Sequence, residues 1–323
     1  MSGWGALRRR ILTPDDSATR LDVRGFHIKN PDARELLETI GRTFLTGYAM
    51  AAEARTAAEA EVHLERVATR YRGFAYEGAA MAFAVRDGMP FSTGGKVAAF
   101  FSGRGDAHIF MVYVGIGWAM ARLPRFRWST LYLPDPMLRY LALDGYGFHQ
   151  AYFKTEKYVH QQYRERHFPW PSRAHQWYVN RAIDQGIGRA MWFIGGTDAM
   201  LVARLLDTFA EDRRPDLYAG AGLAATYAGG ATEDELHAFF DHAGPYRPQV
   251  MQGSAFAAGA RVRAGLVVPH NELATRIFCG MSPSQASKIT DDVVPDEPDS
   301  GELPVFEIWR QRITNELVAT GRC

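Results

Sequence analysis

The strongest constraint on the fold is a small-residue segment that recurs along most of the chain. Each copy is an aliphatic or aromatic stretch with a central glycine followed by another small residue, as in QGIGRAMWFIGG from Gln185. One reference glycine from each copy gives Gly41, Gly78, Gly115, Gly147, Gly188, Gly220 and Gly253. The gaps between them are 37, 37, 32, 41, 32 and 33 residues, which indicates a structural unit of about 35 residues.

The residues between the glycine segments predict one helical hairpin per unit. Double glycines at 195–196 and 229–230 end the first helix, and segments 200–209 and 233–240 then show apolar residues at helical spacing. Thr197, Asp198 and Thr232 stand where the capping residues of those second helices belong. We therefore expect an all-α protein with about seven helical hairpins resembling tetratricopeptide-type repeats, curved into a solenoid or toroid with an inner groove or cavity.

Glycine inside a helix lowers the stability of that helix, so another interaction has to offset the loss. It costs roughly 1 kcal/mol relative to alanine, and close approach between the backbones of neighbouring helices is the usual gain. In DQGIGR no β-like run precedes Gly188, and neither G-x-G-x-x-G nor G-x-x-x-x-G-K-[ST] is present, so a phosphate-binding loop is not favoured. We interpret Gly188 as a helix-packing residue.

The ends of the chain differ from the middle in composition. Residues 1–23 are expected to form an N-terminal arm and residues 24–280 the helical repeat domain. Residues 281–304 are acidic and rich in proline and serine, which predicts a linker, and residues 305–323 are expected to form a C-terminal capping helix. Long insertions in repeats are often lids, and the aromatic insertion at 154–177 is interpreted as a surface or lid loop.

Charge and composition restrict the partners. A net charge of +1 without clustered basic residues argues against nucleic-acid binding. The chain lacks an apolar run of 18 residues and a signal-peptide pattern, so we expect a cytoplasmic protein without a membrane span. WGALRRRIL near the N-terminus falls short of a membrane anchor. The two cysteines form no metal spacing, and H-E-x-x-H, C-x-x-C and G-x-S-x-G are absent, so we predict no metal and no cofactor.

Polar residues on or beside the glycine helices are the natural lining of an inner cavity. The candidate catalytic residues, which would donate or accept protons, are Arg189, His149 and Glu77. The candidate substrate-binding residues are His108, Tyr113, Trp118, Tyr146, Tyr152, Gln185, Trp192 and Tyr218. Each has a structural alternative: the charges can pair between helices, the histidines can be hydrogen-bonded core residues, and the aromatics can be core packing.

Several long motifs resemble a known family, the enediyne biosynthesis proteins with domain of unknown function 1702. They are RGFHIKNPDARELLETIGRTFLTGYAMAAEA, YRGFAYEGAAMAFAVRDG, VGIGWAMARLPRF, LDGYGFHQAYF, NRAIDQGIGRAMWFIGGTD and YAGAGLAATYAGG. The likeness runs from about residue 24 to residue 280. It implies a protein encoded beside an iterative polyketide synthase, which helps to convert a polyene into an enediyne core. It supplies no reaction and no catalytic residues.

Two classes of function stay open at this point. The first is a cofactor-independent cyclase or isomerase that acts on a polyketide-synthase-derived conjugated polyene or enediyne precursor. The second is a non-catalytic helical-repeat scaffold or chaperone that docks on the polyketide synthase or a partner enzyme, since such arrays mostly bind proteins. Assembly as a homodimer is left open as well.

Overall fold

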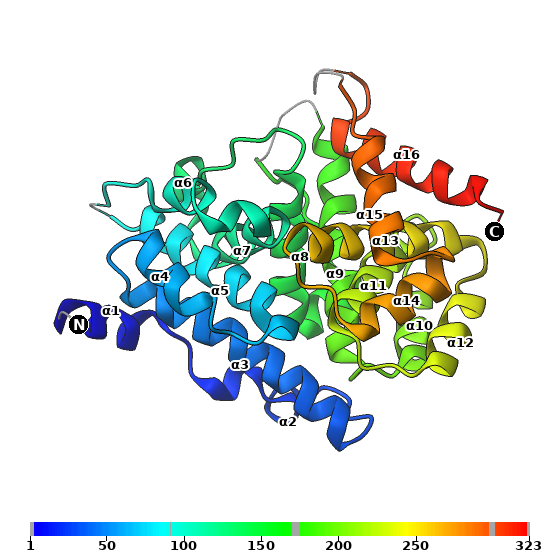
Figure 1. The fold of residues 1–323 in the computed structure, drawn as a ribbon, viewed down its shortest axis with the longest axis horizontal. Helices are drawn as coiled ribbons and strands as arrows, with labels where there is room; N and C mark the ends of the chain where they lie inside the picture. The colour runs from blue at the N-terminus through cyan, green and yellow to red at the C-terminus, as the bar shows by residue number, and fades with distance from the viewer. Residues whose placement is uncertain (1–2, 91, 170–174, 297–300, 322–323) are drawn as a thin grey trace.

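The computed structural model describes residues 3–90, 92–169, 175–296 and 301–321, and within these ranges the chain forms helices and no strands (Figure 1). The all-α prediction is thereby confirmed for the described residues. The chain runs from α1 (Gly3–Leu12) at one end of the molecule to α16 (Val305–Ala319) at the opposite end (Figure 1). No helix in the described part is both long enough and apolar enough to cross a membrane.

A row of helices that each pack on the next forms the centre of the fold. In chain order they are α3 (Pro31–Glu53), α5 (Thr69–Gly88), α7 (Ile109–Arg122), α8 (Tyr140–Phe153), α9 (Val179–Ile194), α11 (Arg214–Ala228), α13 (Arg247–Arg263) and α15 (Pro283–Asp292). A second layer consists of α10 (Ala199–Asp207), α12 (Glu233–Ala243) and α14 (Pro269–Cys279), which follow α9, α11 and α13 and pack on one another. Shorter helices α2 (Leu21–Arg24), α4 (Ala57–Leu64) and α6 (Lys96–Phe101) complete the N-terminal half.

The recurrent glycines lie where neighbouring helices of this row touch. A Cβ atom on Gly188 would lie 2.0 Å from the carbonyl oxygen of Leu217, and one on Gly220 would lie 2.0 Å from that of Gln185. Helices α9 and α11 therefore approach each other through a glycine on each side. The interpretation of Gly188 as a packing residue is confirmed. Of the reference glycines only Gly41 differs, since it faces the side chain of Thr19.

The second-layer helices begin where the capping residues predict. The Asp198 side chain accepts a hydrogen bond from the Leu201 amide at the start of α10. Thr232 and Glu235 form a capping box at the start of α12, in which each side chain binds the other residue's backbone amide. The predicted helices over 200–209 and 233–240 are thus present as α10 and α12.

The row of helices curves so that its later members return to its earlier ones. Arg261 of α13 donates a hydrogen bond of 3.0 Å to the carbonyl oxygen of Arg70 in α5. The rings of Phe74 in α5 and Tyr227 in α11 meet edge to face with their centroids 5.1 Å apart. These contacts bring α5, α11 and α13 around a common interior. Helices α7 and α8 are joined through a short 3₁₀ helix, η3 (Arg125–Thr130), rather than through an α-helix of the second layer.

The expectation of a linker over 281–304 is wrong for residues 283–292, which form α15. Ser282 caps this helix by accepting a hydrogen bond from the Gln285 amide, and Pro283 occupies its first turn. Ala286 and Thr290 are buried on the face that packs against α13. Local capping and this apolar face outweigh the acidic composition. Residues 297–300 of the segment, and 170–174 of the proposed lid loop, lie outside the described residues.

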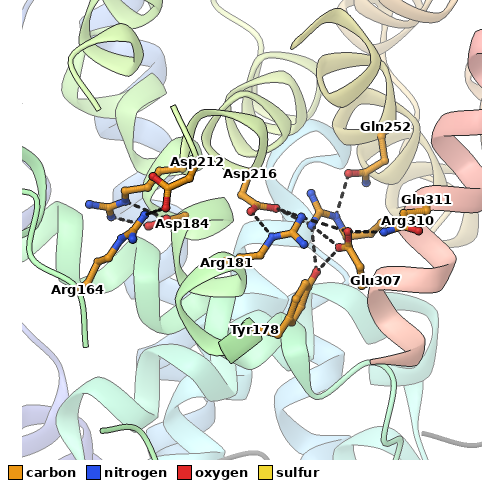
Figure 2. Close-up of polar contacts among 11 residues, drawn as sticks. Arg164, Tyr178, Arg181, Asp184, Asp212, Asp216, Gln252, Glu307, Arg310 and Gln311 are labelled. Atoms are coloured by element: carbon orange, nitrogen blue, oxygen red, sulfur yellow. Dashed lines mark hydrogen bonds and ion pairs between the residues drawn. The ribbon is translucent and has the colours of Figure 1, made fainter. Parts of the chain in front are cut away.

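A buried ion network fastens α16 to the row of helices. The Arg310 guanidinium lies 2.6 Å from Asp216 of α11 and 3.1 Å from Glu307 of its own helix. Arg181 of α9 pairs with the same aspartate at 2.8 Å, and the Tyr178 hydroxyl donates to Glu307. Figure 2 shows that these side chains converge from separate helices. Such a network specifies where the C-terminal helix docks, because a charge left unpaired in the interior would be costly.

Lys29, in the segment between α2 and α3, contacts residues of the C-terminal half. Its ammonium lies 2.8 Å from Glu235 and donates a hydrogen bond of 2.8 Å to the carbonyl oxygen of Gly230. We expect Lys29→Met to lower the free energy of unfolding by about 1–2 kcal/mol, because these half-buried acceptors would lose their charged donor and keep only neutral ones. Chemical denaturation measures this change. Lys288→Met is the control, since the exposed Lys288–Asp292 pair contributes at most about 0.5 kcal/mol. Equal effects of the two substitutions would contradict the assignment.

Candidate functional site

The row of helices surrounds a cavity of about 110 Å³. Its walls come mainly from α3, α5, α7, α8, α9, α11 and α13, and they are largely apolar. Aromatic rings supply much of the surface: Phe44, Phe74, Phe110, Trp118, Phe148 and Phe193. An apolar, aromatic-walled cavity with few polar groups is typical of small-molecule sites.

Three charged side chains from three helices meet at this cavity. Arg189 of α9 forms an ion pair with Asp144 of α8, and its guanidinium lies 4.0 Å from a carboxylate oxygen of Glu77 in α5. All three side chains are at least 92% buried. The charges thus lie in an environment where unbalanced charge is costly.

The glycines explain how these residues come so close. A Cβ atom on Gly115 of α7 would lie 2.2 Å from the Glu77 carbonyl oxygen, and one on Gly186 of α9 would lie 1.8 Å from the Asp144 carbonyl oxygen. The backbones that carry the two carboxylates are therefore in direct contact with their neighbouring helices. Helix packing at glycine fixes the positions of the charged groups.

Burial decides the protonation state of the cluster. Burial raises the pKa of Glu77 from 4.5 to about 7, with the Arg189 charge opposing the shift and the Asp144 charge adding to it. Burial also raises the pKa of Asp144, against the attraction of the Arg189 guanidinium that it contacts. Two ionised carboxylates beside one guanidinium would leave a net negative charge. Glu77 makes the longer contact with the guanidinium, so it is the carboxyl group of the pair that takes up a proton as the pH falls through about 7.

His149 of α8 also lines the cavity and is neutral. Burial, together with the nearby positive charge of Arg122, lowers the pKa of its ring to about 3. Its Nδ1 atom is buried and has no hydrogen-bond partner among the described residues. The ring packs edge to face against Trp118, with the centroids 5.5 Å apart. A neutral imidazole with a free nitrogen can donate to or accept from a ligand.

The structure brings five of the predicted site residues to the cavity. They are the three candidate catalytic residues Glu77, His149 and Arg189, and the aromatic residues Trp118 and Tyr152. Trp118 stacks obliquely on Phe148, and the two rings form part of one wall. The sequence reasoning thus selected residues that share one space, although they come from four different helices.

The other six predicted residues do not line the cavity, because their polar groups are engaged elsewhere or they face another helix. The ring of His108 stacks on that of Tyr76 with the centroids 3.7 Å apart. The Tyr113 hydroxyl accepts a hydrogen bond from the Asp135 amide. The Tyr146 hydroxyl donates to Glu165, that of Tyr218 to Asp207, and the Trp192 indole to the Gly229 carbonyl oxygen. The carbonyl group of Gln185 packs against Gly220. For Tyr113, Tyr146, Trp192 and Tyr218 the structural alternative describes the observed contacts, whereas the buried His108 Nδ1 and Gln185 Nε2 atoms have no hydrogen-bond partner among the described residues.

Sequence reasoning missed two charged residues of the cavity, Asp144 and Arg122. Asp144 stands between Leu143 and Gly145 inside an apolar helix, and a lone carboxylate there needs a buried cation as its partner. A lone aspartate in an otherwise apolar helix was therefore the sequence feature that could have identified Asp144 as a site residue. Arg122 ends α7 just before a Leu-Pro pair, where a basic residue is ordinary at a helix C-terminus, so nothing in the sequence distinguished it.

No three His, Cys, Asp or Glu side chains in the described ranges come together as a group that could hold a metal ion. The acid–base groups at the cavity are the carboxylates of Glu77 and Asp144 and the ring of His149. The arrangement can therefore hold and move protons beside an apolar ligand with its own side chains.

The fold and the site define an all-α protein with an aromatic-walled cavity and a buried carboxylate–arginine cluster beside it. The chain belongs to the family described as "Protein of unknown function (DUF1702)", whose sequence pattern matches residues 3–317. That match extends beyond the predicted 24–280 likeness at both ends and includes α1 and most of α16. Comparison with curated proteins and with solved structures finds no match.

Proposed function

We propose that this protein is a cofactor-independent isomerase or cyclase that transfers protons to and from a long, conjugated, apolar substrate. The observation that carries the proposal is the Glu77 carboxyl group, which lines the apolar cavity beside the Arg189–Asp144 ion pair and whose pKa burial raises to about 7. A general acid works best when its pKa lies near the working pH, and burial is the usual way to raise a carboxyl group to that value.

The shape of the cavity favours an extended substrate. Phe110 and Arg122 both line it and stand twelve positions apart on α7. At a rise of 1.5 Å per residue this separation is about 18 Å. The lining residues therefore extend along most of the length of α7. An unbranched chain fits such a space better than a compact ring system does.

The proposed chemistry needs no oxidant or reductant. The Glu77 carboxyl group gives its proton to one carbon of a conjugated chain, and a π-electron pair of the chain forms the new C–H bond. The chain becomes a delocalised cation, and Glu77 becomes a carboxylate. Loss of a proton from another carbon back to that carboxylate moves the double bonds. If a second double bond first attacks the cation, a C–C bond forms and the proton loss completes a cyclisation.

The charge balance of the cluster supports this direction of proton transfer. With Glu77 protonated, the Arg189 and Asp144 charges cancel, and a neutral substrate meets a neutral cluster. After the transfer the cluster carries one net negative charge next to the cation. Phe148 and Trp118 add the negative faces of their rings to the walls. Asp144 and Arg189 thereby act as a fixed electrostatic partner of Glu77.

The biological setting and the finer architecture are also part of the proposal. The resemblance to enediyne biosynthesis proteins points to a polyene from an iterative polyketide synthase as the substrate, on its way to an enediyne core. A cytoplasmic protein would receive that polyene directly from the synthase. We further infer that α9 to α14 represent the hairpin repeats expected from the glycine spacing, since their helices alternate between the two layers.

The test is to reconstitute an enediyne polyketide synthase and its thioesterase with and without this protein, in H₂O and in D₂O. We expect an isomeric product with a shifted ultraviolet absorption, and mass spectrometry should show one deuterium in the product made in D₂O. Glu77→Gln should slow its formation at least about 100-fold, because the proton donor is lost. Glu316→Gln, an exposed change on α16, is the matched control and should behave as wild type.

Two results would overturn the proposal. If the polyene is unchanged and the protein co-purifies with it or with the synthase, the protein is a binding module, the scaffold or chaperone function considered as the alternative. If product forms equally well with Glu77→Gln, the chemistry does not depend on this carboxyl group.

A further inference from the structure

One end of the cavity carries a positive charge that no protein group neutralises. Arg122 is the last residue of α7; it lines the cavity and is exposed, so it lies where the cavity meets solvent, and among the described residues its guanidinium has neither an ion pair nor a hydrogen bond. The acidic side chains that line the cavity are Glu77 and Asp144. Both belong to the cluster with Arg189, so they leave Arg122 available to a ligand.

His149 adds an unused hydrogen-bonding group at the same end. It is 95% buried, and its Nδ1 atom lacks a partner among the described residues. Trp118, one helical turn before Arg122 on α7, packs edge to face on the His149 ring with the centroids 5.5 Å apart, and the Arg122 charge helps to lower the pKa of that ring, so the two side chains lie at the same end of the cavity. An unpartnered polar atom in the interior is costly unless a ligand completes it.

The opposite end of the cavity has a different character. Phe110, at the start of α7, lines it together with Phe256 and Trp309. The Phe256 and Trp309 rings are 4.7 Å apart, and the Phe110 and Trp309 rings stack with their centroids 6.4 Å apart. The cavity therefore runs from a basic end with an unpartnered imidazole to an aromatic end.

We propose that the Arg122–His149 end binds the carboxylate head of a long-chain acid, whose hydrocarbon tail extends past Glu77 to Phe110, Phe256 and Trp309. The inference rests on the proposed function and deepens it, because it defines the substrate as a free unsaturated carboxylic acid. Arg122 supplies the charged donors, since a guanidinium matches the planar geometry of a carboxylate. His149 supplies a neutral N–H.

The placement of the head group also fixes which carbons are protonated. Gly115 contacts the backbone of Glu77 and stands seven positions before Arg122 on α7. This separation is about 10 Å of helix rise. A chain anchored by its carboxylate at Arg122 therefore presents its middle, rather than the carbons next to the carboxyl group, to the Glu77 carboxyl. The shift of double bonds or the ring closure is expected to begin there.

The experiment uses parinaric acid, a conjugated tetraene fatty acid that fluoresces in apolar surroundings, and its methyl ester, which has the same chain without the charge. We expect wild-type protein to bind the acid at least about tenfold more tightly than the ester, as for a hydrogen bond to a charged group. Arg122→Gln should remove this preference and leave the affinity for the ester unchanged. The unchanged ester affinity shows in the same titration that the variant is folded.

Two further variants sharpen the measurement. Arg204→Gln removes an exposed arginine on α10 and should keep the full preference for the acid. His149→Phe keeps an aromatic ring and should weaken the acid and the ester alike, by about threefold, because either head group can accept one hydrogen bond from the neutral imidazole; the preference for the acid should remain.

Equal affinity of wild-type protein for acid and ester would overturn the head-group assignment and leave the apolar cavity of the proposed function intact. A preference that persists in Arg122→Gln would overturn the role of this residue. Failure to bind either probe would overturn both the head-group assignment and the proposed function.

Discussion

Replacing Gly186 by alanine is expected to lower the free energy of unfolding by about 3 kcal/mol or more. The new Cβ atom would lie 1.8 Å from the Asp144 carbonyl oxygen and 2.7 Å from the Phe148 amide nitrogen. Both atoms are backbone, so no side-chain rotation relieves the clash, and α8 and α9 have to separate. Intrinsic helix propensity would favour alanine by roughly 1 kcal/mol, so a large loss can come only from this contact. Urea unfolding followed by circular dichroism measures the difference.

Gly259→Ala in α13 is the matched control for Gly186→Ala. It makes the same chemical change inside a helix of the same row, but its Cβ atom would meet two side-chain hydroxyls, that of Thr290 at 3.2 Å and that of Ser287 at 3.9 Å. The Thr290 side chain can give way by a few tenths of an ångström, so we expect stability within about 1 kcal/mol of wild type. If Gly186→Ala were as stable as Gly259→Ala, the backbones of α8 and α9 could not be in contact as described.

The glycine spacing carried much of the information about the fold because it reflects direct backbone contact. Gly188 and Gly220 could be assigned to helix packing from the sequence, since glycine in an otherwise apolar helical segment lowers helix stability and a close helix–helix contact offsets that loss. Thr232 likewise marked the start of α12 through its capping box. Composition was the weaker guide, because the proline and serine that suggested a linker are also the residues that begin α15.

The candidate site was only partly predictable, because the sequence does not show which face of an inner helix is turned toward the cavity. Tyr218 and Tyr227 lie on the same helix, α11, nine positions apart. Since a helix has 3.6 residues per turn, nine positions are two and a half turns, and the two side chains point to opposite sides. Tyr227 lines the cavity, whereas Tyr218 donates to Asp207 of the second layer. The direction in which the row curves decides between them, and it depends on contacts distant in the sequence.

Glu77 is expected to make the protein less stable as the pH rises from about 4.5 to about 7. In the unfolded chain this carboxyl group loses its proton at its ordinary pKa of 4.5, whereas burial in the folded protein raises the pKa to about 7. Below pH 4.5 both states hold the proton and the group has no effect on stability. Between the two values the unfolded state releases it first, so unfolding becomes easier, and above pH 7 the full loss is present. A difference of about 2.5 pKa units corresponds to about 3 kcal/mol.

Comparison of wild type with Glu77→Gln at pH 4 and pH 8 isolates this contribution, because the amide cannot titrate. We expect the variant to gain about 3 kcal/mol relative to wild type between the two pH values, as measured by urea unfolding at each. The comparison between pH values cancels the constant effect of replacing the carboxyl group beside Arg189. Parallel pH profiles would show that Glu77 is ionised in the folded protein at neutral pH. It would then have no proton to give, and the acid role proposed for it would be wrong.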